Sequence, residues 1–234
     1  MRILLTRAQA DAERTAARLT ALGHESIISP VIEIIGVPAK LPAQQFGAVV
    51  TTSAHAFAAA DVRELSNTPL YVVGERTREA AQAAGWIAPI HVGEDAKGLV
   101  EVMRRDSSLL RQVLYLAGRD RKPDIETAAQ EIGLDLNVIE TYAARETSSL
   151  NDETKRALRG GALDAVLHYS RRSAELFIAL AQRAEVWPIA EKVPHFALSA
   201  DVAEPLIAAG ARTQVAAHPD EDHLLALLTH ADRR

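Results

Sequence analysis

The sequence predicts an α/β protein built from two doubly wound parallel-sheet domains, joined by a two-strand hinge, with the second domain inserted in the first. Three observations predict this fold. Short apolar runs alternate with alanine-rich segments of helical period along nearly the whole chain. Several helical segments end in glycine shortly before the next apolar run. Two long extended runs are not followed promptly by a helix, and 234 residues are enough for two domains.

About ten short apolar runs have the composition of strands that are buried on both faces of a parallel sheet. The clearest of them cover residues 2–6, 26–29, 48–52, 70–73, 87–92, 113–117, 165–169, 195–199 and 213–217.

The segments between these runs have the spacing of helices that bury one face. In the first segment the residues on one face are Ala12, Ala16, Leu19 and Leu22, and Gly23 follows as the helix end. The same pattern recurs in the second segment, with Thr77, Ala80, Ala81 and Ala84 before Gly85, and further helix ends are predicted at Gly133 and Gly210. Repeated units of this kind make either one sheet of ten strands or two sheets of about five.

Two long extended runs favour two sheets. Residues 31–38 prolong the second strand, and residues 138–143 form another extended run. A pair of strands crossing between two domains accounts for both, so that residues 1–36 join residues 143–234 and residues 37–142 form an inserted α/β domain. In the alternative interpretation both runs are long edge strands of a single sheet.

Composition and charge exclude several classes of protein. The formal net charge of −5 disfavours a broad basic surface for nucleic acid, so any anion site must be local. The absence of cysteine excludes disulfides, thiolate nucleophiles and cysteine-ligated metal. The sequence contains no signal peptide and no apolar stretch that could span a membrane, so we expect a soluble cytoplasmic protein without a membrane partner.

Ligands of doubly wound sheets bind beyond the carboxyl ends of the strands, where loops enter helices. Hydroxyl, glycine and arginine residues are frequent at these ends, which are Thr6-Arg7, Thr51-Thr52-Ser53, Gly74-Glu75-Arg76-Thr77, Gly118-Arg119-Asp120-Arg121, Tyr169-Ser170-Arg171-Arg172-Ser173 and Ser199-Ala200-Asp201. Serine and threonine cap helices in any protein, so single residues of this kind are not diagnostic. Arginine beside free helix N–H groups, in contrast, is typical of a carboxylate or phosphate site.

Other chemistries find little support. The nucleotide fingerprints G-x-G-x-x-G and G-x-x-x-x-G-K-[ST] are absent from the sequence. His218, Asp220, Asp222 and His223 lie close together in a polar stretch that contains proline, where capping is favoured over metal binding. The remaining histidines show no pairing, and no Ser-His-Asp triad can be assigned.

A set of short motifs, in order over about 200 residues, resembles the uroporphyrinogen-III synthase family. The motifs are Ile3-Leu4-Leu5-Thr6-Arg7, Thr51-Thr52-Ser53 with Ala56, Val72-Val73-Gly74 with Thr77 and Gly85, Val113-Leu114-Tyr115-Leu116-Ala117-Gly118-Arg119, Gly133, Thr141-Tyr142, Tyr169-Ser170 with Ser173, and Phe196-Ala197-Leu198 with Gly210. The sequence departs from the family pattern at Ala8, where members usually carry proline. It departs again at Ser199-Ala200-Asp201-Val202-Ala203, in place of a Gly-Pro and Thr-Thr-Ala helix start.

The resemblance implies a cofactor-free enzyme that closes the linear tetrapyrrole hydroxymethylbilane. The hydroxyl of ring A leaves to give an azafulvene, and the new bond forms between the azafulvene carbon and the substituted carbon of ring D. The spiro intermediate then rearranges, so that ring D is inverted in uroporphyrinogen III. Uncatalysed closure gives the uninverted isomer, so catalysis is chiefly positioning and electrostatics in a cleft that closes over the substrate. The family's tyrosine falls on Tyr142, whose phenol stays protonated at neutral pH and can donate.

We therefore expect a small-molecule partner, the polycarboxylate tetrapyrrole, bound by an enzyme that acts as a monomer without metal or other cofactor. The expected catalytic residue is Tyr142, and the expected substrate-binding residues are Arg7, Thr52, Ser53, Gly74, Thr77, Gly118, Arg119, Tyr169, Ser170 and Ser199. The alternative is a non-catalytic cytoplasmic two-domain module that binds an anionic metabolite.

Overall fold

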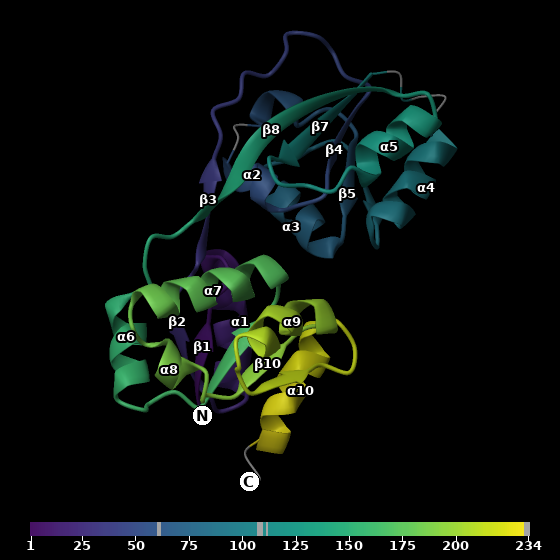
Figure 1. Ribbon diagram of the computed structural model, residues 1–234. Coiled ribbons are helices and arrows are strands. Elements are labelled where there is room, and N and C mark those ends of the chain that lie inside the picture. The colour runs from purple at the N-terminus through teal and green to yellow at the C-terminus, as the bar shows by residue number, and fades with distance from the viewer. Residues whose placement is uncertain (60–61, 107–109, 111, 232–234) are drawn as a thin grey trace. The chain divides into compact units, whose positions relative to one another are not determined.

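The computed structural model describes residues 1–59, 62–106, 110 and 112–231 (Figure 1). The chain forms two compact units, unit 1 (Met1–Glu33 with Arg145–Arg234) and unit 2 (Ile34–Ala144). The described strands form one sheet of five and one sheet of six, with helices between successive strands. The predicted α/β class with parallel sheets is thus confirmed. The alternative interpretation, a single sheet of ten strands, is wrong.

Unit 1 contains a parallel sheet in the order β11-β10-β9-β1-β2. Its strands are β1 (Arg2–Leu5), β2 (Glu25–Ile28), β9 (Ala165–His168), β10 (His195–Ala197) and β11 (Thr213–Val215). Its helices are α1 (Gln9–Ala21), α6 (Asp152–Arg159), α7 (Arg171–Arg183), α8 (Trp187–Ala190), α9 (Ala200–Ala208) and α10 (Glu221–Ala231).

The core of unit 1 lies on both faces of this sheet. Leu4 packs with residues of α6, α7, α8 and α9, whereas its neighbours Ile3 and Leu5 pack with residues of α1 and α10. Successive side chains of a strand point to opposite faces, and both faces are covered here, which explains why these strands are apolar without alternation.

Unit 2 contains a six-stranded sheet in the order β3-β8-β7-β4-β5-β6, in which the pairs from β8 to β6 are parallel. Its strands are β3 (Ile32–Gly36), β4 (Ala48–Thr51), β5 (Leu70–Val73), β6 (Ile90–Gly93), β7 (Gln112–Gly118) and β8 (Asp135–Glu146). Its helices are α2 (His55–Ala59), the 3₁₀ turn η1 (Arg63–Leu65), α3 (Glu75–Ala83), α4 (Ala96–Asp106) and α5 (Asp124–Glu131). Residues of α2 and α3 pack on one face, and residues of α4 and α5 pack on the other.

The two long extended runs connect the units. β3 and β8 are neighbours in one sheet, and the division between the units falls within both strands. The predicted insert, residues 37–142, differs from unit 2 by three residues at one end and by two at the other. Where the strands leave unit 2, Arg145 Nη2 lies 2.8 Å from Glu33 Oε2.

Two local predictions need correction. Residues 26–38 do not form one prolonged strand, because β2 ends at Ile28 and β3 begins at Ile32 in the other sheet. Pro30 lies between them and has no N–H to donate to a strand ladder. Leu22 is also not on the buried face of its helix, because it follows the last residue of α1 and is 53% exposed.

The predicted helix ends are confirmed. Gly23, Gly85, Gly133 and Gly210 have φ angles between 70° and 87°, the left-handed conformation that glycine adopts just past a helix. Within the described ranges, no helix is long and apolar enough to cross a membrane.

Candidate active site

Several of the predicted site residues lie at one edge of the sheet in unit 2. β8, β7, β4 and β5 are neighbouring parallel strands, so their carboxyl ends share one edge. Thr52 and Ser53 follow β4 directly, Gly74 follows β5, and Gly118 is the last residue of β7. Tyr142 lies opposite Gly118 in β8.

Tyr142 is half-buried, and its ring lies against Gly118. A Cβ atom on Gly118 would meet Cε2 and Cζ of Tyr142 at 2.7 Å and its hydroxyl at 2.9 Å. The ring of His55, in the first turn of α2, is 5.8 Å away between centroids. The main chain is held as well, because the N–H of Arg119 donates to the carbonyl of Tyr142 at 2.9 Å.

A second tyrosine, Tyr115, belongs to this edge and was missed by the sequence analysis. Its hydroxyl lies 3.2 Å from Thr52 Oγ1, and burial of the ring raises the pKa of its phenol. The signal was present, because a tyrosine inside an apolar strand needs a hydrogen-bond partner for its hydroxyl. Ser53 Oγ accepts from the N–H of His55 at 3.3 Å, which makes it a cap of α2.

The two arginines after β7 are both paired with carboxylates. Arg119 Nε lies 3.1 Å from Glu140 Oε2, and the side chain of Arg119 is 57% exposed. Arg121 donates to Glu126 Oε1 at 2.6 Å and to the carbonyl of Gly118 at 3.0 Å. Arg121 therefore fixes the loop after β7, while the side chain of Arg119 is more than half exposed.

Gly74 and Thr77 lie at the start of α3 but differ in exposure. Gly74 has a φ of 75° at the start of α3, and its carbonyl accepts the N–H of Thr77 at 3.1 Å. Thr77 itself is 4% exposed, packed inside unit 2. Of these two residues, Gly74 therefore presents main-chain groups at the sheet edge, and Thr77 supports the helix.

In unit 1 the predicted residues Arg7 and Tyr169 meet at a carboxylate of the chain itself. Glu221 Oε1 accepts from Arg7 Nη1 at 3.2 Å, from Thr15 Oγ1 at 2.6 Å and from the Tyr169 hydroxyl at 2.8 Å. Arg7 Cζ lies 3.9 Å above the centre of the Tyr169 ring. Arg18 donates to the other oxygen of Glu221 at 2.7 Å.

Opposing effects act on the pKa of the Glu221 carboxyl. Burial by itself raises it, but hydrogen bonds from Thr15, Tyr169 and Arg18 and the charge of Arg7 together hold this pKa below its ordinary value. Burial raises the pKa of the Tyr169 phenol. Glu221 was not predicted from the sequence, because it lies more than 200 residues from Arg7.

Ser170 and Ser199 are helix caps. Ser170 Oγ accepts the N–H of Ser173 at 3.2 Å at the start of α7, and Ser199 Oγ accepts the N–H of Val202 at 3.4 Å at the start of α9. Asp201, the acidic residue that departs from the family pattern, lies 3.3 Å from Arg171 Nη1. Its charge is therefore balanced locally.

Two histidines do pair, contrary to the sequence analysis. His168 Nε2 and His195 Nδ1 are 2.9 Å apart in the interior of unit 1, and His195 Nε2 lies 3.0 Å from the carbonyl of Ala190. Since a carbonyl only accepts, His195 donates from Nε2 and accepts from His168 at Nδ1. His168 Nδ1 is then an acceptor, and it has no partner in the structure.

The polar stretch before α10 caps that helix. Asp220 Oδ1 accepts the N–H of His223 at 2.9 Å, as expected of a cap. Across the residues that the structure describes, no group of three or more histidine or carboxylate side chains is placed to hold a metal ion.

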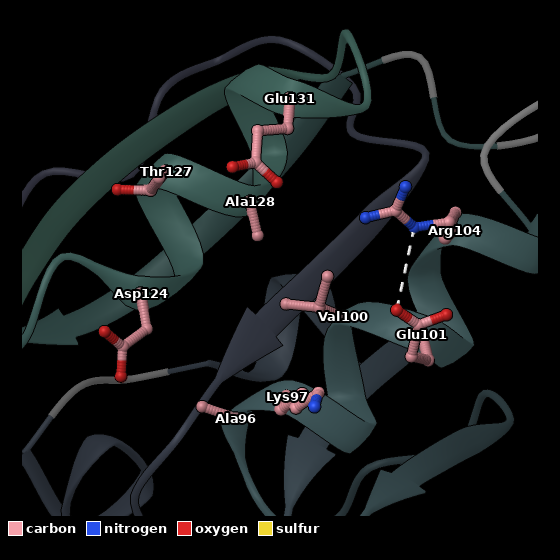
Figure 2. Close-up of a pocket in the computed structure, with 9 residues that line it drawn as sticks. All are labelled: Ala96, Lys97, Val100, Glu101, Arg104, Asp124, Thr127, Ala128 and Glu131. Atoms are coloured by element: carbon pink, nitrogen blue, oxygen red, sulfur yellow. Dashed lines mark ion pairs between the residues drawn. The ribbon is translucent and has the colours of Figure 1, made fainter.

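A groove between α4 and α5 has a volume of about 400 Å³ (Figure 2). Lys97 and Arg104 lie on its α4 side, and Arg104 pairs with Glu101 at 3.8 Å. Asp124 and Glu131 lie on its α5 side, so carboxylates outnumber cations around it. The groove contains none of the predicted site residues, and its charge disfavours an anionic ligand.

Comparison with known proteins decides the family. The model of the uroporphyrinogen-III synthase HemD family matches residues 13–226, which is most of the chain. The chain belongs to this family. The family identified by resemblance is therefore confirmed, while no curated protein matches the sequence closely enough to add to it.

Solved structures support the same fold for this family member. The uroporphyrinogen-III synthetase of Helicobacter pylori is similar with a TM-score of 0.66 and 18% identity, over 98% of this chain and 99% of that one. A mutant uroporphyrinogen III synthase of the extremely thermophilic bacterium Thermus thermophilus gives a TM-score of 0.53 and 19% identity, over 100% of this chain and 98% of that one. At such identities the likeness shows the fold, and the roles of individual residues stay predictions.

Proposed function

We propose that Tyr142 is the proton donor with which this chain performs the reaction of its family, the closure of hydroxymethylbilane to uroporphyrinogen III. Membership of the family makes the chain a cyclising lyase of porphyrin biosynthesis. The family match over residues 13–226 carries the reaction, and the position of the Tyr142 hydroxyl at the carboxyl edge of the unit 2 sheet supports its role.

The first step is loss of the ring A hydroxyl. The Tyr142 hydroxyl gives its proton to the departing oxygen, the carbon–oxygen bond breaks, and water leaves. The electron pair of the pyrrole nitrogen is delocalised to the carbon that lost the oxygen, and this forms the azafulvene. The azafulvene carbon then bonds to the substituted carbon of ring D, and the spiro intermediate rearranges. Ring D loses a proton on final closure, which restores the proton that Tyr142 supplied, so one water is released overall.

The polycarboxylate substrate needs many hydrogen-bond donors, and the strand ends supply them. In unit 2 we assign main-chain donors near Ser53, Gly74 and Gly118, with the hydroxyl of Thr52 and the exposed guanidinium of Arg119. Thr77 acts from inside by fixing α3. In unit 1 we assign the main chain near Ser170 and Ser199.

Arg7 and Tyr169 need a separate assignment. Both already bind the carboxylate of Glu221, so a substrate carboxylate reaches them only by exchange with Glu221. The Glu221 contacts nevertheless support the carboxylate-binding chemistry that was predicted for these two residues.

Product isomer analysis tests the proposed function. The purified chain is incubated with hydroxymethylbilane, and the products are oxidised and separated into type I and type III isomers. We expect type III product in excess of the type I product that forms without protein. Type I product alone, from a folded sample, would contradict the proposal and favour the non-catalytic anion-binding module, which the family match does not favour.

Three further expectations belong to the proposal. The net charge of −5 supports a protein without a nucleic-acid partner. Action as a monomer and a cytoplasmic location stay predictions, to be measured by light scattering and by cell fractionation.

A further inference from the structure

The strand pair that carries Tyr142 contains an irregularity. β7 and β8 pair in regular parallel register from Gln112–Asp135 to Ala117–Glu140, but Gly118 then pairs with Tyr142 instead of Thr141. Thr141 is therefore an extra residue, a β-bulge, which is rare in parallel pairs. A bulge of one residue moves all following side chains to the opposite face.

The packing shows the effect of this bulge. Before it, Leu136 packs with the α4 and α5 side of the sheet, and Ile139 packs with the α2 and α3 side. Unbroken alternation would place Tyr142 on the side of Leu136. Tyr142 instead packs on the side of Ile139, where its ring meets His55 of α2 and lies over Gly118.

The main chain at the bulge is held from both neighbouring strands. The N–H of Val37 donates to the carbonyl of Thr141 at 2.9 Å, and the N–H of Arg119 donates to that of Tyr142 at 2.9 Å. Thr141 is fully buried, and its hydroxyl donates to the carbonyl of Ala117 at 3.4 Å. The strand therefore has little freedom to retreat from Gly118.

Only the absence of a side chain at Gly118 leaves room for Tyr142. The three atoms nearest to a Cβ at this position all belong to Tyr142, at 2.7–2.9 Å, a distance that real Cβ atoms hardly ever show. The φ of Gly118 lies outside the left-handed region, so its backbone does not require glycine. A methyl group would therefore meet the phenol ring of Tyr142 before any other group.

We propose that Gly118 is a positioning residue, which together with the bulge at Thr141 determines where the Tyr142 hydroxyl lies. The effect on turnover rests on the proposed function, in which that hydroxyl is the proton donor. A general acid must lie within hydrogen-bond reach of the atom that it protonates, and a displacement of about 1 Å costs roughly 100-fold in rate.

The first test is Gly118→Ala, with Gly98→Ala as matched control. Gly98 lies in α4, where a Cβ would make only ordinary contacts, at 3.4 Å with Asp95 Oδ1 and at 3.9 Å with Gly93 Cα. We expect Gly118→Ala to lower kcat about 100-fold with little change in KM, and Gly98→Ala to keep the parent kcat. A Gly118→Ala enzyme with the parent kcat overturns the proposal.

A second readout does not depend on activity. The chain has four tyrosines, so incorporation of 3-fluorotyrosine gives four ¹⁹F resonances, and Tyr142→Phe identifies the one from Tyr142. Gly118→Ala should shift this resonance and leave those of Tyr71 and Tyr169 in place, and Gly98→Ala should shift none of the three. An unmoved Tyr142 resonance overturns the positioning role. A shifted resonance in a chain that makes only type I product contradicts the proposed function and supports the positioning role.

A double variant covers a loss of folding. If the methyl group acts only through Tyr142, then Gly118→Ala lowers the melting temperature in the parent but not in a Tyr142→Ala background. An equal drop in both backgrounds overturns the proposal, because the methyl group would then act on something other than the phenol ring.

Discussion

The proposed function assigns the catalytic proton to one group, the hydroxyl of Tyr142. Tyr142→Phe keeps the ring that packs against Gly118 and removes only this hydroxyl. We expect kcat to fall more than KM rises, by about 1–3 kcal/mol of activation free energy, because a general acid is lost. Steady-state kinetics with a melting curve measures this. A variant as fast as the parent would make Tyr142 a packing residue of β8.

Arg7 leads to a different expectation. Its side chain is 20% exposed and lies beside Glu221, so Arg7→Ala leaves that half-buried carboxylate without one of its partners. We expect the free energy of unfolding to fall by about 1–3 kcal/mol, measured by urea denaturation. Arg14→Ala is the control, because Arg14 is 49% exposed and its pair with Asp11 should contribute less than about 1 kcal/mol.

The sequence places single residues at the site but does not show their partners. Thr52 and Gly118 could be found because each ends or follows an apolar run that is recognisable by itself, whereas Tyr142 was assigned through the resemblance to the family. The partners of Tyr115 and Glu221 could not be found in this way, because these contacts depend on the order of strands and the packing of helices. The bulge at Thr141 is of the same kind, since nothing in the sequence marks an extra residue in a strand.

Helix caps contribute at the scale of single elements. Ser170 Oγ caps α7, so Ser170→Ala should lower the free energy of unfolding by about 1 kcal/mol and change kcat little, because main-chain donors survive the substitution. Ser149→Ala, at an exposed position, serves as control. Complete loss of turnover in a folded Ser170→Ala protein would show that this side chain itself does chemistry.

The histidine pair joins the neighbouring strands β9 and β10 and makes stability depend on pH. Burial lowers the pKa of both imidazoles, helped at His168 by the nearby His195, whose own pKa falls to about 4. In the unfolded chain both imidazoles bind protons near pH 6.5, whereas in the folded chain His195 binds its proton only near pH 4. The free energy of unfolding should therefore be highest above pH 6.5 and fall as the pH drops toward 4.

Denaturant titrations at several pH values between about 7 and about 4.5 measure this dependence. When His168 and His195 are both replaced by leucine, we expect the free energy of unfolding to change less with pH. The same slope in both proteins would assign the acid sensitivity to other groups. The pair could not be predicted from the sequence, because the two residues are 27 positions apart and meet only through the pairing of β9 with β10.

Most strands and helix ends could be predicted because their signals are local. Apolar runs of four or five residues and glycine past a helix depend on near neighbours only. The exception is the run from residue 26 to residue 38, where an apolar pattern continues from one sheet into another. Pro30 was the visible marker of the break.

Charge acts on the molecule as a whole. With a net charge of −5 the long-range field repels a polycarboxylate, and affinity must come from short-range donors. Raising the ionic strength from about 0.02 to about 0.15 M screens this repulsion, so we expect KM to fall or stay level. A KM that rises steeply with salt would show instead that the field at the site is positive.

The place where the chain passes twice between its two units has a practical consequence. Because β3 and β8 are hydrogen-bonded neighbours, the first and last residues of unit 2 lie side by side. The same holds for Glu33 and Arg145, where unit 1 is interrupted. Glu33 and Arg145, which flank the cut, already form an ion pair. A short turn between them could replace all of unit 2, and unit 2 could be moved as a cassette into another protein with neighbouring strands.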